Sequence, residues 1–283
     1  MYRVIKLLGH WLSRRRPETL ERMARVLAIL CFDLLRLRRR LIIKNLTIAF
    51  GERWSVAQRV ATGRAAWKHF FLTAMETLRA VDTDVLAETT YEGIEHISAA
   101  LAQGRGAYMI AGHMGNWEVM AGAGTRFAAP TSCLVKEIGK GGANQLIDEL
   151  RRKIGWTPIY RKPAGTALKQ VRAALERNEL VAFMLDQARP GAPLIPFFGQ
   201  PAKTLTSLAA FWRKHPSPVI PVHIQRRSPT RHHVTVWPPL DFQRSGDHRD
   251  DTLANTALCN RMIEKIIQQC PEQYFWLHNR WKP

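Results

Sequence analysis

The sequence has few cysteines and none of the spacings that mark a metal site. Its four cysteines, Cys31, Cys133, Cys259 and Cys270, are scattered over 283 residues without a C-x-x-C pair. Neither a zinc site nor a disulfide framework is therefore indicated, and a reducing, cytoplasmic setting is expected.

Acidic residues are also scarce. The 23 Asp and Glu residues face 42 Lys and Arg residues, which gives a net charge of +19 and a pI near 10.5. With 46% hydrophobic residues the chain is not intrinsically disordered, and it is long enough to bury a large core. Anionic partners are expected, and nucleic acid, acidic phospholipid and an acidic carrier protein all qualify.

No apolar run reaches the roughly 18 residues that a membrane-spanning helix needs. The best candidate, Val26 to Leu35, is interrupted by Asp33, and no small-residue cleavage site of a signal peptide follows it. A helix that lies on a membrane surface fits this segment better, unless it packs on the domain and the nearby arginines stay solvated. The arginines that would meet anionic headgroups are Arg14, Arg15, Arg16, Arg36, Arg38, Arg39 and Arg40.

Several common catalytic motifs are absent. The chain has no G-x-S-x-G, no H-E-x-x-H, no G-x-x-x-x-G-K-[ST], and no G-x-G-x-x-G after a predicted strand. Serine-esterase, zincin and nucleotide-binding chemistry are therefore disfavoured. The glycine-rich run from Gly139 to Gly142 is interpreted as a loop, although it precedes a helix and could accept a phosphate.

The pattern of apolar residues divides the chain in two. Residues 1–85 are predicted to form a helical, membrane-associating segment, with helices at 2–13, 18–40 and 55–81. Residues 86–283 alternate short apolar runs with amphipathic stretches, which is typical of an α/β domain. Strands are expected at 107–111, 132–135, 157–160, 180–185, 219–225 and 233–237, and helices at 95–102, 116–127, 143–154, 164–177, 205–214 and 251–270. The predicted fold class is α/β, with a mixed, mostly parallel sheet flanked by helices and an N-terminal helical cap.

The segment GAYMIAGHMGNWEVMAGAG, residues 106 to 124, carries the clearest chemical signal. In one continuous helix, His113 and Glu118 would lie on different faces, but in a strand-turn-helix the carboxylate can fold back toward the imidazole. Gly115 and Asn116 would support the turn, with Asn116 near the N-cap. A His base held by a carboxylate activates a hydroxyl in acyl transfer. The alternative is a helix-capping histidine and a surface glutamate.

This segment, together with the YEGIEHISAAL that precedes it, resembles the bacterial lipid A late acyltransferases of the lysophospholipid acyltransferase superfamily, which share a His-x4-Asp/Glu motif. The resemblance covers about residues 40 to 283. It continues through NLTIAFGERW at 45 to 54, FMLDQARPGAPLIPFFGQPA at 183 to 202, PVIPVHI at 218 to 224 and PEQYFWLHNRWKP at 271 to 283. It implies a glycerolipid acyltransferase-like fold and transfer of a fatty acyl chain from acyl carrier protein to a lipid hydroxyl, with no metal or organic cofactor.

The resemblance also implies roles for individual residues. His113 would be the general base and Glu118 would orient it. Basic residues that could hold the phosphates of the acceptor are Lys136, Arg151, Arg152 and Arg161, and each also fits a solvated surface charge. Asp186, Gln187 and Arg189 match the family's Asp-Gln block and are expected at the same sheet edge as His113.

The favoured hypothesis is a membrane-surface O-acyltransferase in lipid A biosynthesis. Its expected partners are an acyl-acyl carrier protein donor, a phosphorylated lipid acceptor and the anionic surface of the inner membrane, at the cytoplasmic face. One alternative keeps the chemistry but acylates another lipid or glycolipid. A nucleic-acid-binding protein is disfavoured, because the aromatic residues are not interleaved with the basic clusters and no nucleic-acid-binding motif appears.

Overall fold

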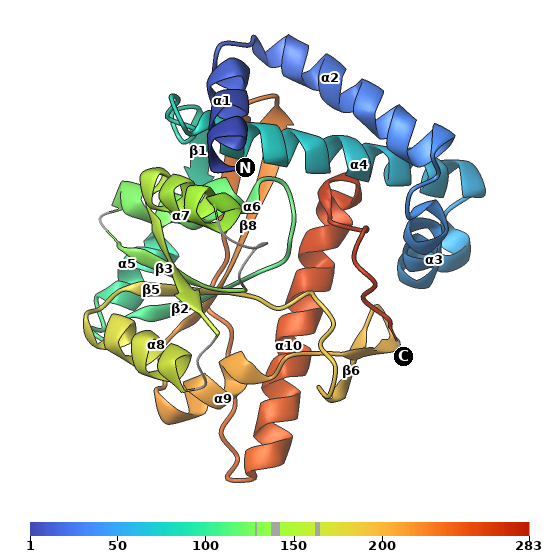
Figure 1. Ribbon diagram of the computed structural model, residues 1–283. Coiled ribbons are helices and arrows are strands. Elements are labelled where there is room, and N and C mark those ends of the chain that lie inside the picture. The colour runs from blue at the N-terminus through green and yellow to red at the C-terminus, as the bar shows by residue number, and fades with distance from the viewer. Residues whose placement is uncertain (128, 137–141, 162–164, 283) are drawn as a thin grey trace.

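The computed structural model describes residues 1–127, 129–136, 142–161 and 165–282. The run interpreted as a loop from Gly139 lies outside these residues, except for Gly142 at the start of a helix. An N-terminal set of helices packs beside a sheet that has helices on both faces (Figure 1). The expected α/β fold class is confirmed.

The N-terminal region contains no strand among the described residues up to Glu88. Its helices are α1 (Tyr2–Ser13), α2 (Pro17–Ile29), the π-helix η1 (Leu30–Leu34), α3 (Arg39–Phe50), the 3₁₀-helix η2 (Gly51–Arg53) and α4 (Val56–Arg79). Ser55 starts α4 with a capping box, in which its hydroxyl accepts from the Gln58 amide and the Gln58 side chain accepts from the Ser55 amide.

The single helix predicted for 18–40 is wrong beyond residue 34. The chain leaves the helix after η1, and Arg36 and Arg38 adopt left-handed backbone conformations with φ of 52° and 53°. A new helix, α3, starts after them at Arg39. Apolar periodicity does not report single left-handed residues, so the pattern could not show this break.

Seven strands form the main sheet in the order β1-β9-β8-β2-β5-β3-β4. The five strands from β8 to β4 are mutually parallel, whereas β9 is antiparallel to β8 and pairs in parallel with β1. The strands are β1 (Thr89–Glu92), β2 (Ala107–Ala111), β3 (Thr131–Val135), β4 (Trp156–Tyr160), β5 (Leu180–Met184), β8 (Val219–Ser228) and β9 (Arg231–Val236). A separate antiparallel hairpin joins β6 (Leu194–Phe197) to β7 (Gln200–Lys203).

Side chains of β2 alternate between two cores. Tyr108 and Ile110 belong to a cluster shared with α8, α9, α10 and the N-terminal helices, whereas Ala107, Met109 and Ala111 belong to a cluster shared with α5, α6 and α7. All five residues are buried, as expected for a central parallel strand. The helices concerned are α5 (Glu95–Leu101), α6 (Trp117–Gly122), α7 (Gly142–Ile154), α8 (Thr166–Glu176), α9 (Ser207–Lys214) and α10 (His248–Gln269).

The predicted strands and helices of the α/β region are all present within a few residues of their expected bounds. The sequence analysis missed β1, α3 and the β6–β7 hairpin, which are short or lack a clear period. It also predicted one helix at 116–127, where the structure has two elements, α6 and the 3₁₀-helix η3 (Ala123–Phe127). A further 3₁₀-helix, η4 (Pro271–Gln273), follows α10.

The predicted division at residue 85 is not visible as a gap in the core. Phe32, Ile42 and Trp67 from the N-terminal helices belong to the same buried cluster as Tyr108 of β2 and Ile263 of α10. The division into residues 1–85 and 86–283 stays a prediction. No helix in the described part of the chain is both long and apolar enough to cross a membrane.

Candidate active site

The loops that follow parallel strands meet at one edge of the sheet. His113 follows β2, Lys136 follows β3, Arg161 follows β4 and Asp186 follows β5. The carboxyl ends of parallel strands lie at the same edge, where α/β sheets bind ligands. Because β2 and β5 are in register, with Ala111 opposite Met184, the second residue after each strand comes to the same place.

His113 is clamped by Asp186. The imidazole Nδ1 lies 2.7 Å from Asp186 Oδ1, and the His113 backbone amide donates to Asp186 Oδ2 at 2.9 Å. Burial alone would raise the pKa of Asp186, but the charge and the hydrogen bonds of His113 outweigh burial and lower the pKa. An ionised Asp186 fixes the ring and favours the tautomer that carries its proton on Nδ1.

The second ring nitrogen of His113, Nε2, does not contact Asp186 and could accept a proton. This atom lies 3.4 Å from Gln187 Nε2, which fits an amide hydrogen donated to an unprotonated ring nitrogen. The imidazole packs against Trp117, at a centroid distance of 5.3 Å, and against Phe275, at 6.3 Å, and these two rings also contact each other at 5.8 Å. With its side chain 18% exposed, His113 can reach a substrate while the aromatic rings limit access of water.

The predicted contact between Glu118 and the His113 imidazole is not formed, because Glu118 pairs with Arg151. Its carboxylate accepts from Arg151 Nε and Nη2, both at 3.1 Å, in a bidentate pair that is almost fully buried. The carboxylate beside His113 is Asp186 instead. Glu118 lies in the first turn of α6, which packs against α7, and α7 carries Arg151.

Gly115 and Asn116 support the turn. A Cβ on Gly115, whose φ is +56°, would come within 2.3 Å of the Ile224 carbonyl oxygen, so only glycine fits. Its amide donates to the Gln273 carbonyl at 3.1 Å and is therefore not free to stabilise an oxyanion. Asn116 caps α6 as expected by accepting from the Val119 amide at 3.3 Å.

The predicted phosphate-binding residues fall into two groups. Lys136, Arg152 and Arg189 are exposed, and Arg161 is partly buried with an Nε atom that has no partner among the described residues. Burial, followed by the charge of Arg189, lowers the pKa of Arg161. Arg151 differs, because it is 3% exposed and bonded to Glu118.

The C-terminal segment completes the site. The Phe275 amide donates to the His113 carbonyl at 2.9 Å, and Met114 forms a bridge with Tyr274. His278 Nε2 accepts from the Ala188 amide at 2.9 Å, directly after Asp186 and Gln187. The sequence analysis assigned no role to Phe275, His278 or Trp117; the PEQYFWLHNRWKP block was the one signal that could have indicated the first two. In the described part of the chain, no group of His, Cys, Asp and Glu is placed to hold a metal ion.

Comparison with known proteins gives a consistent result. A family model described as bacterial lipid A biosynthesis acyltransferase matches residues 5–283. The lipid A biosynthesis lauroyltransferase of Escherichia coli is 27% identical over 96% of this chain and 88% of its own length. The palmitoleoyltransferase of Escherichia coli and a lipid A biosynthesis acyltransferase of Shigella flexneri are each 24% identical, over 84% of this chain and 77% of their own length.

Proposed function

Because this chain belongs to the bacterial lipid A biosynthesis acyltransferase family, we propose that it transfers a fatty acyl chain from acyl carrier protein to a hydroxyl of a phosphorylated lipid A precursor. The observation that carries the proposal is the His113–Asp186 pair, in which Nδ1 lies 2.7 Å from the carboxylate and the His113 side chain is 18% exposed. Acylation of a hydroxyl needs a general base at this position, and it does not require a covalent intermediate between the protein and the acyl group.

In the proposed reaction, His113 Nε2 takes the proton of the acceptor hydroxyl as its oxygen attacks the carbonyl carbon of the thioester. Asp186 stabilises the imidazolium, which is the role that the sequence analysis assigned to Glu118. When the tetrahedral intermediate collapses, the C–S bond breaks and His113 returns the proton to the leaving thiolate. Glu118 then acts indirectly, because its pair with Arg151 holds the start of α6 against α7.

The cations that follow strands at the sheet edge support a phosphorylated acceptor. Lys136, Arg161 and Arg189 follow β3, β4 and β5, on the same edge as His113. Arg161 is the best candidate for a phosphate, since its buried Nε atom has no partner among the described residues. Arg152 is exposed on α7 and is proposed as a weaker, peripheral contact, whereas Arg151 is already bonded.

The N-terminal helices support attachment to a membrane surface, proposed here to be the cytoplasmic face of the inner membrane. Large apolar side chains are exposed on α1 and from α2 to the start of α3: Val4, Leu7, Leu8, Trp11, Val26, Ile29, Leu30, Leu34, Leu35 and Leu37. The loop that contains Arg36 and Arg38 leads into α3, which starts with Arg39 and Arg40, and Arg38 donates to the Leu277 carbonyl at 2.9 Å, next to His278 of the site. Docking through this loop would therefore bring the lipid surface near His113.

The decisive experiment incubates the purified protein with detergent-dispersed lipid A precursor and one of two donors, acyl-acyl carrier protein or acyl coenzyme A, across a salt series. Mass spectrometry identifies the acylated product. We expect faster transfer from the carrier protein, with a rate that falls steeply above about 0.1 M salt, because a chain of net charge +19 attracts an acidic protein over long range. Faster transfer from acyl coenzyme A would overturn the donor assignment. Acylation of a different glycolipid, with none of the lipid A precursor, would overturn the acceptor.

A further inference from the structure

A buried ion pair lies behind the proposed catalytic loop and has no part in the reaction described above. Glu76 of α4 and Arg226 of β8 have side chains that are 3% and 2% exposed. The guanidinium Nε lies 2.9 Å from Glu76 Oε1, and Nη2 lies 2.7 Å from Oε2. Two histidines extend this pair: Arg226 Nη1 donates to His69 Nδ1 at 2.8 Å, and His232 Nε2 lies 3.4 Å from Glu76.

The charges in this cluster are well defined. Burial alone would raise the pKa of Glu76, but the charge of Arg226 and the hydrogen bonds from His232 and Arg226 hold it well below its usual range. Burial and the charge of Arg226 lower the pKa of His69 to about 2, so this ring is neutral and accepts a hydrogen bond. The Glu76 carboxylate is therefore ionised at neutral pH, and it accepts hydrogen bonds from Arg226.

The cluster ends on the backbone and side chain that form the catalytic turn. Asn116 Nδ2 donates to Glu76 Oε2 at 2.9 Å, while its Oδ1 atom caps α6. Arg226 Nη2 donates to Thr73 Oγ1 at 3.1 Å, and Thr73 donates in turn to the Gly115 carbonyl at 2.6 Å. Gly115 and Asn116 lie between His113 and Glu118 in the sequence.

The same turn is held from its other side. The Arg226 amide donates to Gln273 Oε1 at 2.7 Å, and Gln273 Nε2 donates back to the Arg226 carbonyl at 3.0 Å. The Gln273 carbonyl accepts from the Gly115 amide at 3.1 Å. The Gly115 carbonyl is thus bonded to Thr73 and the Gly115 amide to Gln273, and Arg226 forms hydrogen bonds with both of these residues.

We propose that Glu76 and Arg226 are positioning residues for catalysis, which hold the Gly115–Asn116 turn so that His113 meets Asp186 on one side and Glu118 meets Arg151 on the other. This inference rests on the proposed function, because it takes His113 as the base. The charge-assisted bond that Asn116 donates to Glu76 fixes the orientation of the Asn116 side-chain amide. A turn held in this orientation also positions His113 and Glu118, which flank it in the sequence. A shift of about 1 Å in a reacting group is enough to cost about 10²-fold in rate.

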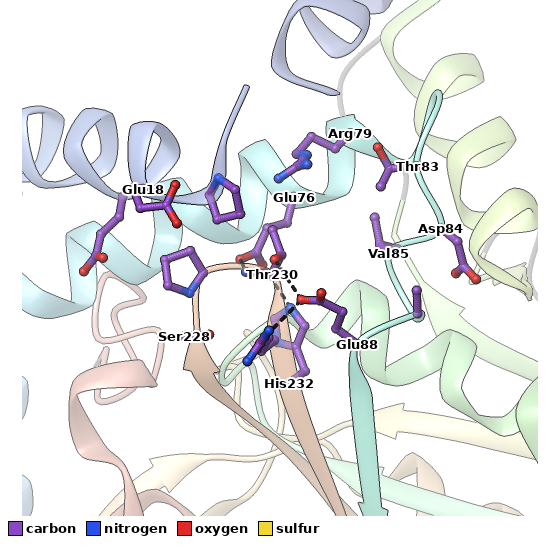
Figure 2. A pocket seen from close by; sticks show the side chains of 15 residues that line it. Glu18, Glu76, Arg79, Thr83, Asp84, Val85, Glu88, Ser228, Thr230 and His232 are labelled. Atoms are coloured by element: carbon purple, nitrogen blue, oxygen red, sulfur yellow. Dashed lines mark hydrogen bonds and ion pairs between the residues drawn. The ribbon is translucent and has the colours of Figure 1, made fainter. Parts of the chain in front are cut away.

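A cavity of about 550 Å³ gives access to this cluster from outside the active site (Figure 2). Glu76 and His232 line it, together with Arg79, Thr230 and Glu88. His113, Asp186 and Arg226 are not among the residues that line it. A small carboxylate that diffuses into the cavity can therefore reach the place of the Glu76 side chain without entering the proposed catalytic site.

The test is chemical rescue. Glu76→Ala should lower kcat for acyl transfer by about 10²-fold and leave KM for the acceptor within about twofold, because the substrate contacts are retained. Formate at tens of millimolar should restore part of the lost kcat, whereas chloride at the same ionic strength should not. The matched control is Glu88→Ala: Glu88 lines the same cavity, but its carboxylate pairs with Arg231 and its side chain is 52% exposed, so activity and the formate response should not change.

A second readout does not depend on turnover. In protein labelled with ¹⁵N at histidine, the ring signals of His113 should move in Glu76→Ala and return toward wild type with formate. If the wild type transfers no acyl chain, the proposed function fails, while these ring signals still report whether Glu76 positions His113. A folded Glu76→Ala protein with normal kcat and unmoved His113 signals would overturn the inference. So would formate that restores the melting temperature but not kcat.

Glu76→Ala leaves Arg226 buried without its partner and could fail to fold. Thr73→Val then decides, because it keeps the side-chain volume and removes only the bond to the Gly115 carbonyl and the acceptor of Arg226 Nη2. We expect kcat to fall about 5-fold to 10-fold at unchanged KM, as for a lost hydrogen bond of about 1 kcal/mol. Normal kcat in folded Thr73→Val would contradict the inference.

Discussion

The sheet edge and the N-terminal helices both depend on arginine, but they use it in opposite ways. Arg151 and Arg226 are 4% and 2% exposed at their side chains, and each forms a bidentate pair with a glutamate. Arg36 and Arg40 are exposed, and no side-chain hydrogen bond or ion pair holds them among the described residues. A buried guanidinium must be paired and so fixes geometry, whereas a solvated one stays available to a ligand or a surface.

The largest expected effect is at the sheet edge. His113→Ala should lower kcat by about 10²-fold or more without a change in fold, because it removes the proposed base. Acyl-transfer assays and circular dichroism on the same preparation measure both. The exposed His248 provides the control, since His248→Ala should leave kcat unchanged. Near-normal transfer by folded His113→Ala protein would remove His113 from the mechanism.

A second pair of variants separates the two carboxylates. Asp186→Asn keeps the shape but loses the charge that stabilises the imidazolium, so kcat should fall by about 10²-fold with a small change in melting temperature. Glu118→Gln weakens the partner of a buried arginine, so its main effect should be a loss of stability of about 3 kcal/mol. Urea unfolding and kinetics on both variants provide the measurement. The reverse pattern, an active Asp186→Asn and a stable, inactive Glu118→Gln, would return the orienting role to Glu118.

The exposed arginines should matter for membrane attachment and little for chemistry. Replacing Arg36 and Arg40 with Gln should weaken binding to anionic vesicles about 30-fold, at roughly 1 kcal/mol per arginine, and make binding less dependent on salt. Activity on detergent-dispersed acceptor should change less. A matched control replaces the exposed Arg244 and Arg249 near the N-terminal end of α10, which lies at the opposite end of the molecule from α1 and α2 (Figure 1). Equal weakening by both pairs would show that net charge, and not this loop, binds the surface.

The smallest effect concerns a buried histidine of the sheet. Burial, followed by the charges of His233 and Arg227, lowers the pKa of His223 to about 4. The unfolded chain therefore binds the proton first, so the free energy of unfolding should be intact above about pH 6.5 and fall as the pH drops toward 4. His223→Gln should remove up to one proton from this dependence, or about 1.4 kcal/mol per pH unit, in urea unfolding at pH 7, 6 and 5. An unchanged slope would mean that other groups carry the acid sensitivity.

The sequence by itself determined most elements of the α/β region and the edge of the sheet that is proposed to carry the chemistry. Apolar runs predicted strands such as β2 and β5 closely, because a central parallel strand must be buried on both faces. The rule that parallel strands end at one edge placed His113 there, and the resemblance to the family's Asp-Gln block placed Asp186 at the same edge. The strands need only local composition, whereas the expected position of Asp186 also needed the family resemblance.

Only the tertiary structure decided which charges meet. His113 and Asp186 pair because β2 and β5 align Ala111 with Met184, a register that depends on contacts between segments 73 residues apart. Glu118, five positions from His113, instead meets Arg151, since α6 packs against α7. Pairing of this kind depends on distances of about 3 Å between side chains from different elements, and a single sequence records spacing along the chain, not distance across it.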